Sequence, residues 1–304
     1  MSPIKPYFSI VIPTFNCAEF IRQTVEMVRE QSFEDWELVM VDDGSTDQTW
    51  EILNDVAVTE SRIKIDQRPE NRTKGPSPCR NIGVENSSGL YIAFLDADDE
   101  WSIDRLLNAY TFIQETNAKA IYSGAWVVVQ KGKYFRESRP IRKGESIFDF
   151  TINGDSFAQT STLLVKSEIA KQVAFPEAIR FHEDFAYFIE VGELVPWSFF
   201  PSKDVIVNWE DNHLKKVNYA DCLYFYQKYK SKSIDKISRI GYLKYTAHEL
   251  AVRQPYDNNI KFYHKFLMEE GVKFGILEFI LFLSPLAYSM LLKIRNKMLV
   301  LKNF

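Results

Sequence analysis

The run from Tyr91 to Leu95 is the feature that most limits how this chain can fold. Five hydrophobic residues follow Gly89-Leu90 without a charged or strongly polar interruption. A short run of this kind, with no alternation of apolar and polar positions, predicts a strand covered on both faces, as in a parallel sheet. The chain is therefore expected to build an α/β fold around this strand.

Three acids follow that strand within four positions: Asp96, Asp98 and Asp99. Open α/β sheets bind ligands at the carboxyl ends of their strands. Carboxylate oxygens suit Mg²⁺ or Mn²⁺, which would also neutralise the clustered negative charge. We predict a metal site that bridges to phosphate groups. The alternative is an acidic turn in which Asp98 or Asp99 only caps a helix that begins near Ser102.

Strand and helix patterns alternate through the first hundred residues. The expected strands cover 8–14, 36–41 and 62–66, and the expected helices cover 18–31, 46–58 and 79–86. Ser45 or Thr46 is placed to cap the second helix. Alternating elements of this length predict a right-handed, doubly wound and mostly parallel sheet.

Two of these strands end in polar clusters. Pro13, Thr14 and Asn16 lie at the end of the first strand, and Asp42 and Asp43 lie at the end of the second. Since the carboxyl ends of parallel strands meet at one edge, these residues and the three acids are expected to line one crevice.

The next hundred residues continue the mixture of elements. We expect a helix over 104–114, a strand over 120–129, a hairpin or mobile loop over 130–144, and strands over 160–165 and within 197–209. Glu183 and Asp184 begin an apolar helix. Asp184 is either a helix acid that interacts with the macrodipole or a catalytic carboxylate. His213, in a polar loop, either joins the metal site or is an exposed loop histidine.

Charge divides the chain more sharply than the net value of −4 implies. Residues 1–215 carry 22 basic and 34 acidic side chains, whereas residues 216–304 carry 15 basic and 7 acidic ones. We expect a catalytic domain over 1–215 and a basic, helical region over 216–304, which favours an anionic surface as partner. Three scattered cysteines and the absence of a secretory signal pattern predict reduced thiols and a cytoplasmic location.

The stretch from Phe274 to Leu292 has one charged residue in 19, Glu278, and is followed by several bases. Roughly 20 apolar residues span a membrane, but Pro285 interrupts this stretch and Glu278 would be costly in hydrocarbon. We expect an interfacial helix pair within 272–304, bent at Pro285 and bound to an anionic membrane surface. A buried core helix or dimer helix is the alternative. The interleaved tyrosines and lysines of 224–230 do not indicate nucleic acid, because no recognised module accompanies them.

Five motifs in order resemble the motif series of family-2 glycosyltransferases. They are Ser9-Ile-Val-Ile-Pro-Thr-Phe-Asn16, Val41-Asp-Asp-Gly-Ser-Thr-Asp47, Arg80-Asn-Ile-Gly83, Phe94-Leu-Asp-Ala-Asp-Asp99 and His182-Glu-Asp184. The resemblance implies the GT-A fold, a Rossmann-like nucleotide-sugar-binding half over 1–100 and an acceptor-binding half over 101–215. It also implies a divalent metal, Mn²⁺ or Mg²⁺, and inversion at the anomeric carbon.

The resemblance also assigns residues to the donor side. Pro13, Thr14 and Asn16 match the turn that flanks the nucleoside, and Asp43 matches the acid that hydrogen-bonds the base. Asp42 is expected to be structural.

Asp96 matches the first acid of the D-x-D element, near the ribose and the metal, and Asp98 matches the direct metal ligand. Asp99 is a third acid of uncertain role. Either Lys74 or Arg80 occupies the place of a basic residue that contacts the base or the diphosphate. The Gly-Pro-Ser-Pro spelling between them departs from the usual pattern and leaves the choice open.

Asp184 matches the general base, which takes the proton of the acceptor hydroxyl as the new bond forms. Glu183 is expected to orient the acceptor or the base. The family's arginine and histidine spelling after the last core strand is absent, so His213 is only a candidate metal or phosphate ligand.

Together these expectations describe a transferase that moves a sugar from a nucleotide-sugar, with UDP as the expected nucleotide. The acceptor would be a hydroxyl of a glycan or of a polyprenyl-linked saccharide in surface polysaccharide synthesis, such as capsule or lipopolysaccharide. Two other functions stay open. A sugar-phosphate nucleotidyltransferase is disfavoured because no glycine-rich loop follows the first strand. A catalytically inactive glycan-binding or scaffold subunit is suggested by the altered loop at 208–213.

Overall fold

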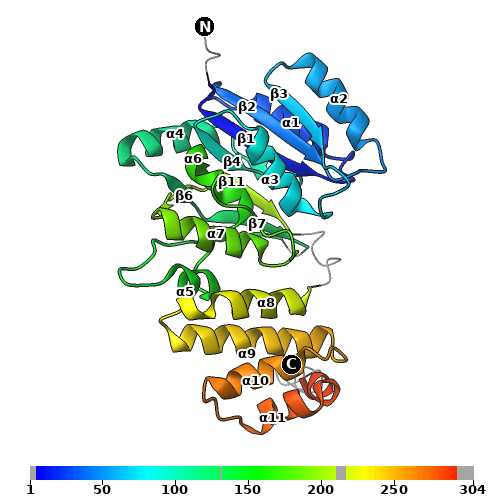
Figure 1. Cartoon of the computed structure of the whole chain (residues 1–304), viewed down its shortest axis with the longest axis vertical. Coiled ribbons are helices and arrows are strands. Elements are labelled where there is room, and N and C mark those ends of the chain that lie inside the picture. Colours follow the sequence, from blue (N-terminus) through cyan, green and yellow to red (C-terminus); the bar gives the residue numbers. More distant parts are fainter. Residues whose placement is uncertain (1–4, 131, 210–216, 293–304) are drawn as a thin grey trace, which may run out of the picture. The chain divides into compact units, whose positions relative to one another are not determined.

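A computed structural model describes residues 5–130, 132–209 and 217–292 (Figure 1). The chain divides into two compact units, one of residues 1–147 with 154–216 and the other of residues 148–153 with 217–304. The predicted His213 lies outside the described residues.

The larger unit is built on a seven-stranded sheet in the order β10-β6-β9-β4-β1-β2-β3. Its strands are β1 (Phe8–Thr14), β2 (Trp36–Asp42), β3 (Ile63–Gln67), β4 (Tyr91–Phe94), β6 (Ala120–Tyr122), β9 (Leu164–Lys166) and β10 (Ser198–Phe199). The first four run parallel, and only β9 is antiparallel to its neighbours. The mostly parallel sheet is confirmed, and β4 is the buried central strand that its hydrophobic run predicts.

Helices follow the strands as the alternation predicts. They are α1 (Ile21–Arg29), α2 (Thr49–Thr59), α3 (Pro76–Asn86), α4 (Arg105–Thr116), α6 (Ser167–Ala170) and α7 (Glu183–Leu194). Pro76 begins α3, where its missing N–H costs nothing. The expected cap of α2 is wrong, because neither Ser45 nor Thr46 occupies the cap position. The helix starts three residues later, and the Asp47 carboxylate accepts a hydrogen bond from the Thr49 amide at 3.0 Å.

Gly83 lets α3 lie directly on β1. A Cβ at this position would stand 2.4 Å from Cγ1 of Val11, a distance that real contacts do not allow. Gly83→Ala is therefore expected to destabilise the larger unit by about 1–3 kcal/mol through overpacking, seen as a lower thermal midpoint. The matched control is Gly241→Ala in another helix, where nothing lies within 4 Å. Equal thermal midpoints for the two variants would show that α3 moves away from β1 without a loss of stability.

A second sheet covers part of the larger unit in the order β5-β11-β7-β8. Its strands are β5 (Glu100–Trp101), β11 (Val205–Asn208), β7 (Ala125–Val129) and β8 (Gly132–Arg136). The single strand expected over 120–129 is wrong. The chain leaves one sheet after Tyr122 and enters the other at Ala125, with Gly124 packed so closely that a Cβ would be 2.8 Å from the Arg136 carbonyl oxygen. The strand expected over 160–165 is also shifted: residues 160–162 form a 3₁₀ turn, η1 (Thr160–Thr162), before β9.

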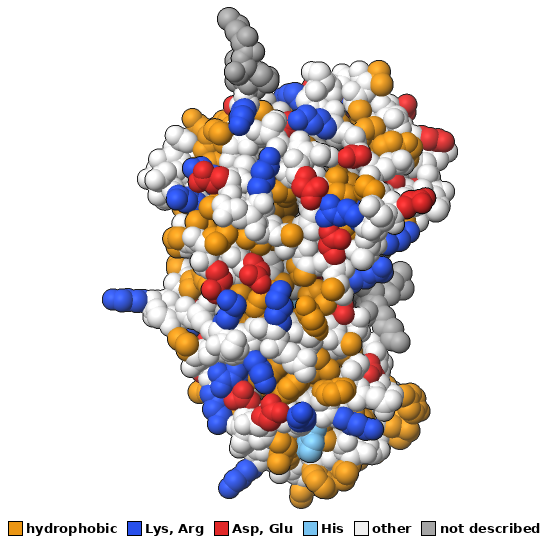
Figure 2. Space-filling model, in the orientation of Figure 1, with side chains coloured by type: hydrophobic (Ala, Val, Ile, Leu, Met, Phe, Trp, Pro, Cys, Tyr) orange, Lys and Arg blue, Asp and Glu red, His pale blue; other side chains and the backbone are white. Residues whose placement is uncertain are grey.

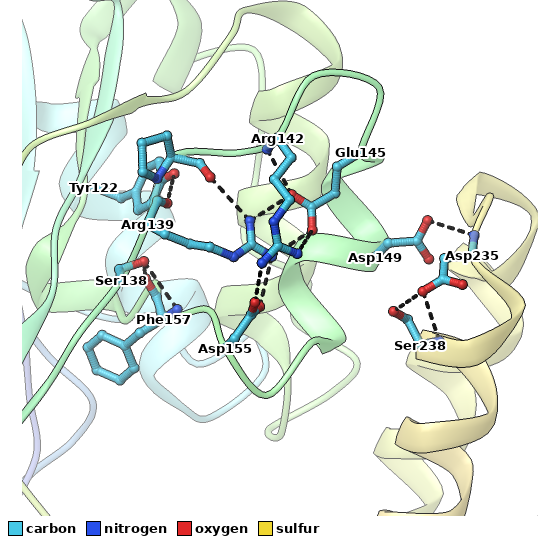
Figure 3. A network of polar contacts seen from close by, with 11 residues as sticks. Tyr122, Ser138, Arg139, Arg142, Glu145, Asp149, Asp155, Phe157, Asp235 and Ser238 are labelled. Carbon is cyan, nitrogen blue, oxygen red and sulfur yellow. Dashed lines mark hydrogen bonds and ion pairs between the residues drawn. The ribbon is translucent and has the colours of Figure 1, made fainter.

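The C-terminal unit is helical, as its sequence predicts. It contains α8 (Tyr219–Tyr229), the 3₁₀ turn η3 (Lys230–Lys232), α9 (Lys236–Arg253), α10 (Ile260–Glu269) and α11 (Ile276–Leu283), together with most of α5 (Ile147–Ile152). The Asp149 carboxylate ties α5 to the start of α9, because it accepts hydrogen bonds from the amides of Ile234 and Asp235 at 2.8 and 3.1 Å. Figure 3 shows Asp149 reaching toward Asp235.

α11 ends at Leu283, and residues 285–292 are helical again after Ser284. The helix is therefore interrupted next to Pro285. Large hydrophobic side chains on this segment face solvent, including Ile276 at 82% and Leu283 at 69% exposure. Figure 2 shows hydrophobic side chains gathered at the end of the C-terminal unit. Within the part of the chain that the structure describes, no helix combines the length and the apolar character needed to cross a membrane.

Candidate functional site

Parallel register brings the ends of β1 and β2 together. Thr14 pairs with Asp42, and the Asp43 amide donates to the Thr14 carbonyl oxygen at 2.8 Å. Thr14 is buried and Pro13 is half-buried. The predicted convergence of these two turns is therefore present in the structure.

Asn16 and Asp42 lock the turns at this edge. Asn16 has a positive φ of 47°, a conformation that asparagine tolerates, and its side-chain oxygen accepts from the Thr46 amide at 2.8 Å. Asp42 accepts from the amides of Gly44 and Ser45 at 3.0 and 2.9 Å. Asp42 thus holds the turn that carries Asp43.

Asp43 has a partner that the sequence did not identify. Its buried carboxylate forms an ion pair with the guanidinium of Arg68, at the start of the loop that joins β3 to α3. Lys74 lies further along that loop, is exposed, and places its ammonium 4.0 Å from the ring centroid of Phe15. Arg68 and Lys74, two of the three bases of this loop, therefore lie beside the turns after β1 and β2.

Arg80, on α3, connects the two acidic motifs. Its side chain is 4% exposed, donates to Asp96 at 2.6 Å and lies 3.4 Å from the carboxylate of Glu183. Two carboxylates around one buried cation favour its charged form, and the pKa of Arg80 is raised despite burial. The structure thus brings together Asp96 and the Glu183-Asp184 pair, which are almost ninety residues apart.

Asp99 does not cap a helix, and that alternative is wrong. α4 begins after Asp104, whereas the Asp99 carboxylate, 3% exposed, accepts from Ser161 Oγ at 2.6 Å and from the Asn208 amide at 2.9 Å. Burial, followed by the charges of Asp96 and Asp98, raises the pKa of Asp99. Asp99 therefore ties the end of β4 to η1 and to β11.

Ser161 and Gln159 support the acids from η1, and the sequence did not single them out. The Ser161 hydroxyl also accepts from the Asp96 amide at 3.0 Å, and Gln159 Nε2 lies 3.4 Å from both Asp96 and Asp99. Polar residues in a short irregular segment carry no local signal for such a role. Only the fold shows that they reach the acids.

A network of arginines and acids fastens the segment that leads to η1 (Figure 3). Arg139 bonds both carboxylate oxygens of Glu145 at 2.7 Å and Asp155 at 2.8 Å. Arg142 forms a further ion pair with Asp155. Paired, hydrogen-bonded charges of this kind restrict the conformation of residues 139–155 just before Gln159.

His182, Glu183 and Asp184 form the start of α7. His182 has a positive φ of 67°, and its ring stacks on Phe185 with centroids 4.7 Å apart. Burial lowers the pKa of His182 to about 3, so its ring is neutral.

Asp184 has the properties of a proton acceptor that works near neutrality. Burial, followed by the charge of Glu183, raises the pKa of Asp184 to about 7. Burial likewise raises the pKa of Glu183, although Arg80 opposes the shift. A carboxyl whose pKa lies near the working pH is suited to general base catalysis.

Asp96 and Asp98, after β4, are the two candidate ligands for a divalent cation. No group of three or more His, Cys, Asp or Glu side chains suited to a metal occurs in residues 5–130, 132–209 and 217–292. Mg²⁺ commonly takes one or two carboxylates and completes its shell with substrate phosphates and water. Asp98 and Asp96 are half-buried and fit that pattern, and Arg80 already pairs with Asp96.

Comparison with known proteins identifies the family. The family model described as "Glycosyl transferase family 2" matches residues 9–173. Relatives include the amylovoran biosynthesis glycosyltransferase AmsB of Erwinia amylovora, 32% identical over 62% of this chain and 64% of its own. The putative teichuronic acid biosynthesis glycosyltransferase TuaG of Bacillus subtilis is 30% identical over 63% and 74%. This chain thus spans less than two thirds of AmsB.

A further relative is WfaP of Escherichia coli, named UDP-Glc:alpha-D-GlcNAc-diphosphoundecaprenol beta-1,3-glucosyltransferase. It is 35% identical over 39% of this chain and 46% of its own.

Solved structures agree on the fold. S. aureus TarS 1-349 superposes with a TM-score of 0.60 at 17% identity, covering 87% of this chain and 79% of TarS, and TarS has also been solved with UDP and with UDP-GlcNAc. The mannosyltransferase PcManGT of Pyrobaculum calidifontis, in complex with GDP-Man and Mn²⁺, gives 0.56 at 16% identity over 98% and 81%. The GT-A fold implied by the motifs is confirmed.

Proposed function

Because this chain belongs to glycosyl transferase family 2, we propose that it transfers a sugar, with inversion, from a nucleotide-sugar to a hydroxyl of a saccharide acceptor. One observation carries the proposal. The buried Arg80 holds Asp96, on the donor side, and Glu183, next to Asp184, within one partly buried cluster. The acid that would deprotonate an acceptor thereby stands beside the acids that would receive the donor.

The donor half would be residues 1–100, with the acceptor half over 101–215. Pro13, Thr14 and Asn16 would flank the nucleoside, and Asp43, oriented by Arg68, would meet the base. Lys74 would serve the diphosphate, because it is exposed at this edge, whereas Arg80 is buried between two carboxylates. UDP is favoured as the nucleotide because TarS has been solved with UDP and WfaP is named for a UDP-sugar.

Asp98, supported by Asp96, would hold Mn²⁺ or Mg²⁺ together with the donor phosphates. A divalent ion bound there would neutralise the charge on the departing nucleoside diphosphate. PcManGT, which contains Mn²⁺, supports this role for the metal. The protein's own contribution is to fix Asp96 through Arg80 and Ser161, and to hold Asp99 through Ser161.

On the acceptor side, Asp184 would take the proton of the attacking hydroxyl. Glu183, held by Arg80, would orient the acceptor or Asp184. Proton removal in the transition state compensates for the weak nucleophilicity of a hydroxyl at neutral pH. The name of WfaP supports a polyprenyl-linked saccharide as acceptor, and AmsB and TuaG support a role in polysaccharide synthesis.

A donor screen tests the transfer reaction. Full-length protein is incubated with UDP- and GDP-sugars, Mn²⁺ and a panel of saccharide acceptors, and release of nucleoside diphosphate is measured. Acceptor-dependent release of UDP from one sugar is expected. Release of inorganic diphosphate from a nucleoside triphosphate and a sugar phosphate would instead indicate nucleotidyl transfer. Binding of nucleotide without turnover on the whole panel would indicate an inactive binding subunit.

The C-terminal region would bring the enzyme to the inner face of the cell membrane. The exposed apolar residues Ile276 and Leu283 and the excess of bases in 216–304 suit an anionic interface. Deletion of 272–304 is expected to abolish flotation with anionic vesicles while UDP binding persists. Loss of the folded state on this deletion would indicate a core helix, and unchanged flotation would place the membrane contact elsewhere.

A further inference from the structure

Glu177, between α6 and α7, contacts three side chains, two from the loop before α3 and one from the middle of α3. Its carboxylate pairs with the guanidinium of Arg72 and accepts from Thr73 Oγ1 at 3.0 Å and from Asn81 Nδ2 at 3.1 Å. The side chain is only 26% exposed. Nothing in the sequence motifs singles out this residue, yet it is the point where these polar contacts converge.

The loop that Glu177 holds is the one that carries the bases of the donor side. At its start, Arg68 pairs with Asp43 and donates to the Arg72 carbonyl oxygen at 2.7 Å. At its end, Lys74 approaches Phe15, and its own carbonyl oxygen accepts from Arg180 at 3.0 Å. Residues 68–75 are therefore attached at one side to the turns after β1 and β2 and at the other to residues 177–180.

The ion pair of Arg72 with Glu177 is better shielded from solvent than its ion pair with Glu85. Glu85 also meets Arg72, at 3.1 Å, but its side chain is 62% exposed, and exposed ion pairs contribute little. Burial by itself would raise the pKa of Glu177, but hydrogen bonds from Arg72, Asn81 and Thr73 outweigh it and lower the pKa. The site therefore stabilises the charged carboxylate.

The segment that bears Glu177 is itself rigidly placed. Asn81 accepts from the Phe175 amide at 2.8 Å and donates to the Phe175 carbonyl oxygen at 2.9 Å, in addition to its bond to Glu177. The ring of Phe175 stacks on Tyr187 of α7, with centroids 3.9 Å apart. Glu177 thus anchors the loop to the same packed segment that leads into α7.

We propose that Glu177 is a positioning residue for donor binding, which holds the loop of residues 68–75 in the conformation that keeps Arg68 on Asp43 and presents Lys74 to the nucleotide-sugar. The proposal rests on the proposed transferase function. Glu177 contacts neither donor nor acceptor in this role. A loop ordered in advance spares the donor the entropic cost of ordering it on binding.

The test compares Glu177→Ala with the matched control Glu85→Ala, which removes the other acid partner of Arg72. Glu177→Ala is expected to raise the donor KM about tenfold, as expected for a loop that must be ordered by the donor, with kcat changed by no more than about twofold. Glu85→Ala is expected to leave both constants near wild type. Glu177→Gln, which keeps the shape but not the charge, is expected to fall between them.

Trypsin gives a second readout that does not depend on turnover. Cleavage after Arg72 and Lys74 reports how often the loop opens. Without nucleotide, Glu177→Ala is expected to be cut faster at these bonds than wild type or Glu85→Ala, and added UDP should narrow the difference.

Equal KM and equal cleavage rates for the two alanine variants would overturn the proposal, as would a loss of kcat at unchanged KM. If Glu177→Ala does not fold, the same comparisons on Glu177→Gln decide. If wild-type protein turns over no donor, the transferase function fails, and the cleavage rates without nucleotide still show whether Glu177 holds the loop.

Discussion

Asp184→Asn is expected to lower kcat about 10²- to 10⁴-fold, the range typical of losing a general base, while the affinity for UDP stays near wild type. The amide keeps the size of the side chain but takes no proton from an acceptor hydroxyl. The measurement is steady-state transfer together with UDP binding by calorimetry. Near-normal turnover in this variant would remove Asp184 from the mechanism.

The pH dependence of the wild type gives the same assignment a second test. Only the deprotonated carboxylate acts as a base, and the pKa of Asp184 is raised to about 7. Transfer at saturating donor is therefore expected to rise with pH through the neutral range and to level off above it. The residual activity of Asp184→Asn should lack this rise with pH. Glu183→Gln should keep the rise but show it at lower pH, because the charge of Glu183 helps to raise the pKa of Asp184. A flat wild-type profile from roughly pH 6 to 8, about one unit either side of this pKa, would contradict the assignment.

The same pKa shift predicts a change in stability with a definite sign. Unfolding returns Asp184 to its ordinary pKa of 3.8. Between that value and about 7, the folded state therefore holds a proton that the unfolded state has released. The contribution of this carboxyl to the free energy of unfolding falls as the pH rises through that window.

Asp98→Ala is expected to weaken Mn²⁺-dependent binding of UDP by roughly tenfold or more, equivalent to at least ~1.4 kcal/mol. Loss of the half-buried carboxylate would remove a ligand from the proposed metal and leave less negative charge to hold it. UDP titrations with Mn²⁺ and with EDTA measure the effect, which should disappear in EDTA.

Glu100→Ala is the matched control for Asp98→Ala. Glu100 is exposed two positions further on, so its removal changes the net charge equally without touching the buried cluster. UDP affinity in Mn²⁺ is expected to be near wild type. Equal losses in the two variants would mean that general electrostatics, and not metal ligation by Asp98, accounts for the effect.

Most of the donor-side geometry could be predicted because it depends on strands. A hydrophobic run ends at Leu95, and parallel pairing of β1, β2 and β4 then places Thr14, Asp42 and the acids after β4 at one edge. Local patterns were less reliable where the chain changes sheets. The hydrophobic stretch around Gly124 reads as one strand, but the close approach of Arg136 separates it into two.

The partners of the acids could not be predicted. The sequence allows Asp99 to be a helix cap or a third acid of uncertain role, whereas in the structure it bonds Ser161 and the Asn208 amide, 62 and 109 positions away. The motifs leave the choice of donor-side base between Lys74 and Arg80 open, and they give no sign that Arg80 joins Asp96 to Glu183. These contacts form between segments whose meeting depends on packing of the whole unit.

Local sequence patterns therefore indicate the order of strands and helices, the sheet edge at which polar residues collect, and the motifs that mark the family. Periodic burial and strand ends are local properties, and they can be read along the chain. The folded chain is needed to see which side chains hold the acids after β4, which base is buried, and how Glu177 contacts the loop of residues 68–75. These features depend on hydrogen bonds and ion pairs between residues far apart in the sequence. Neither partner carries a local sequence signal for the contact, which forms only when the fold brings the two together.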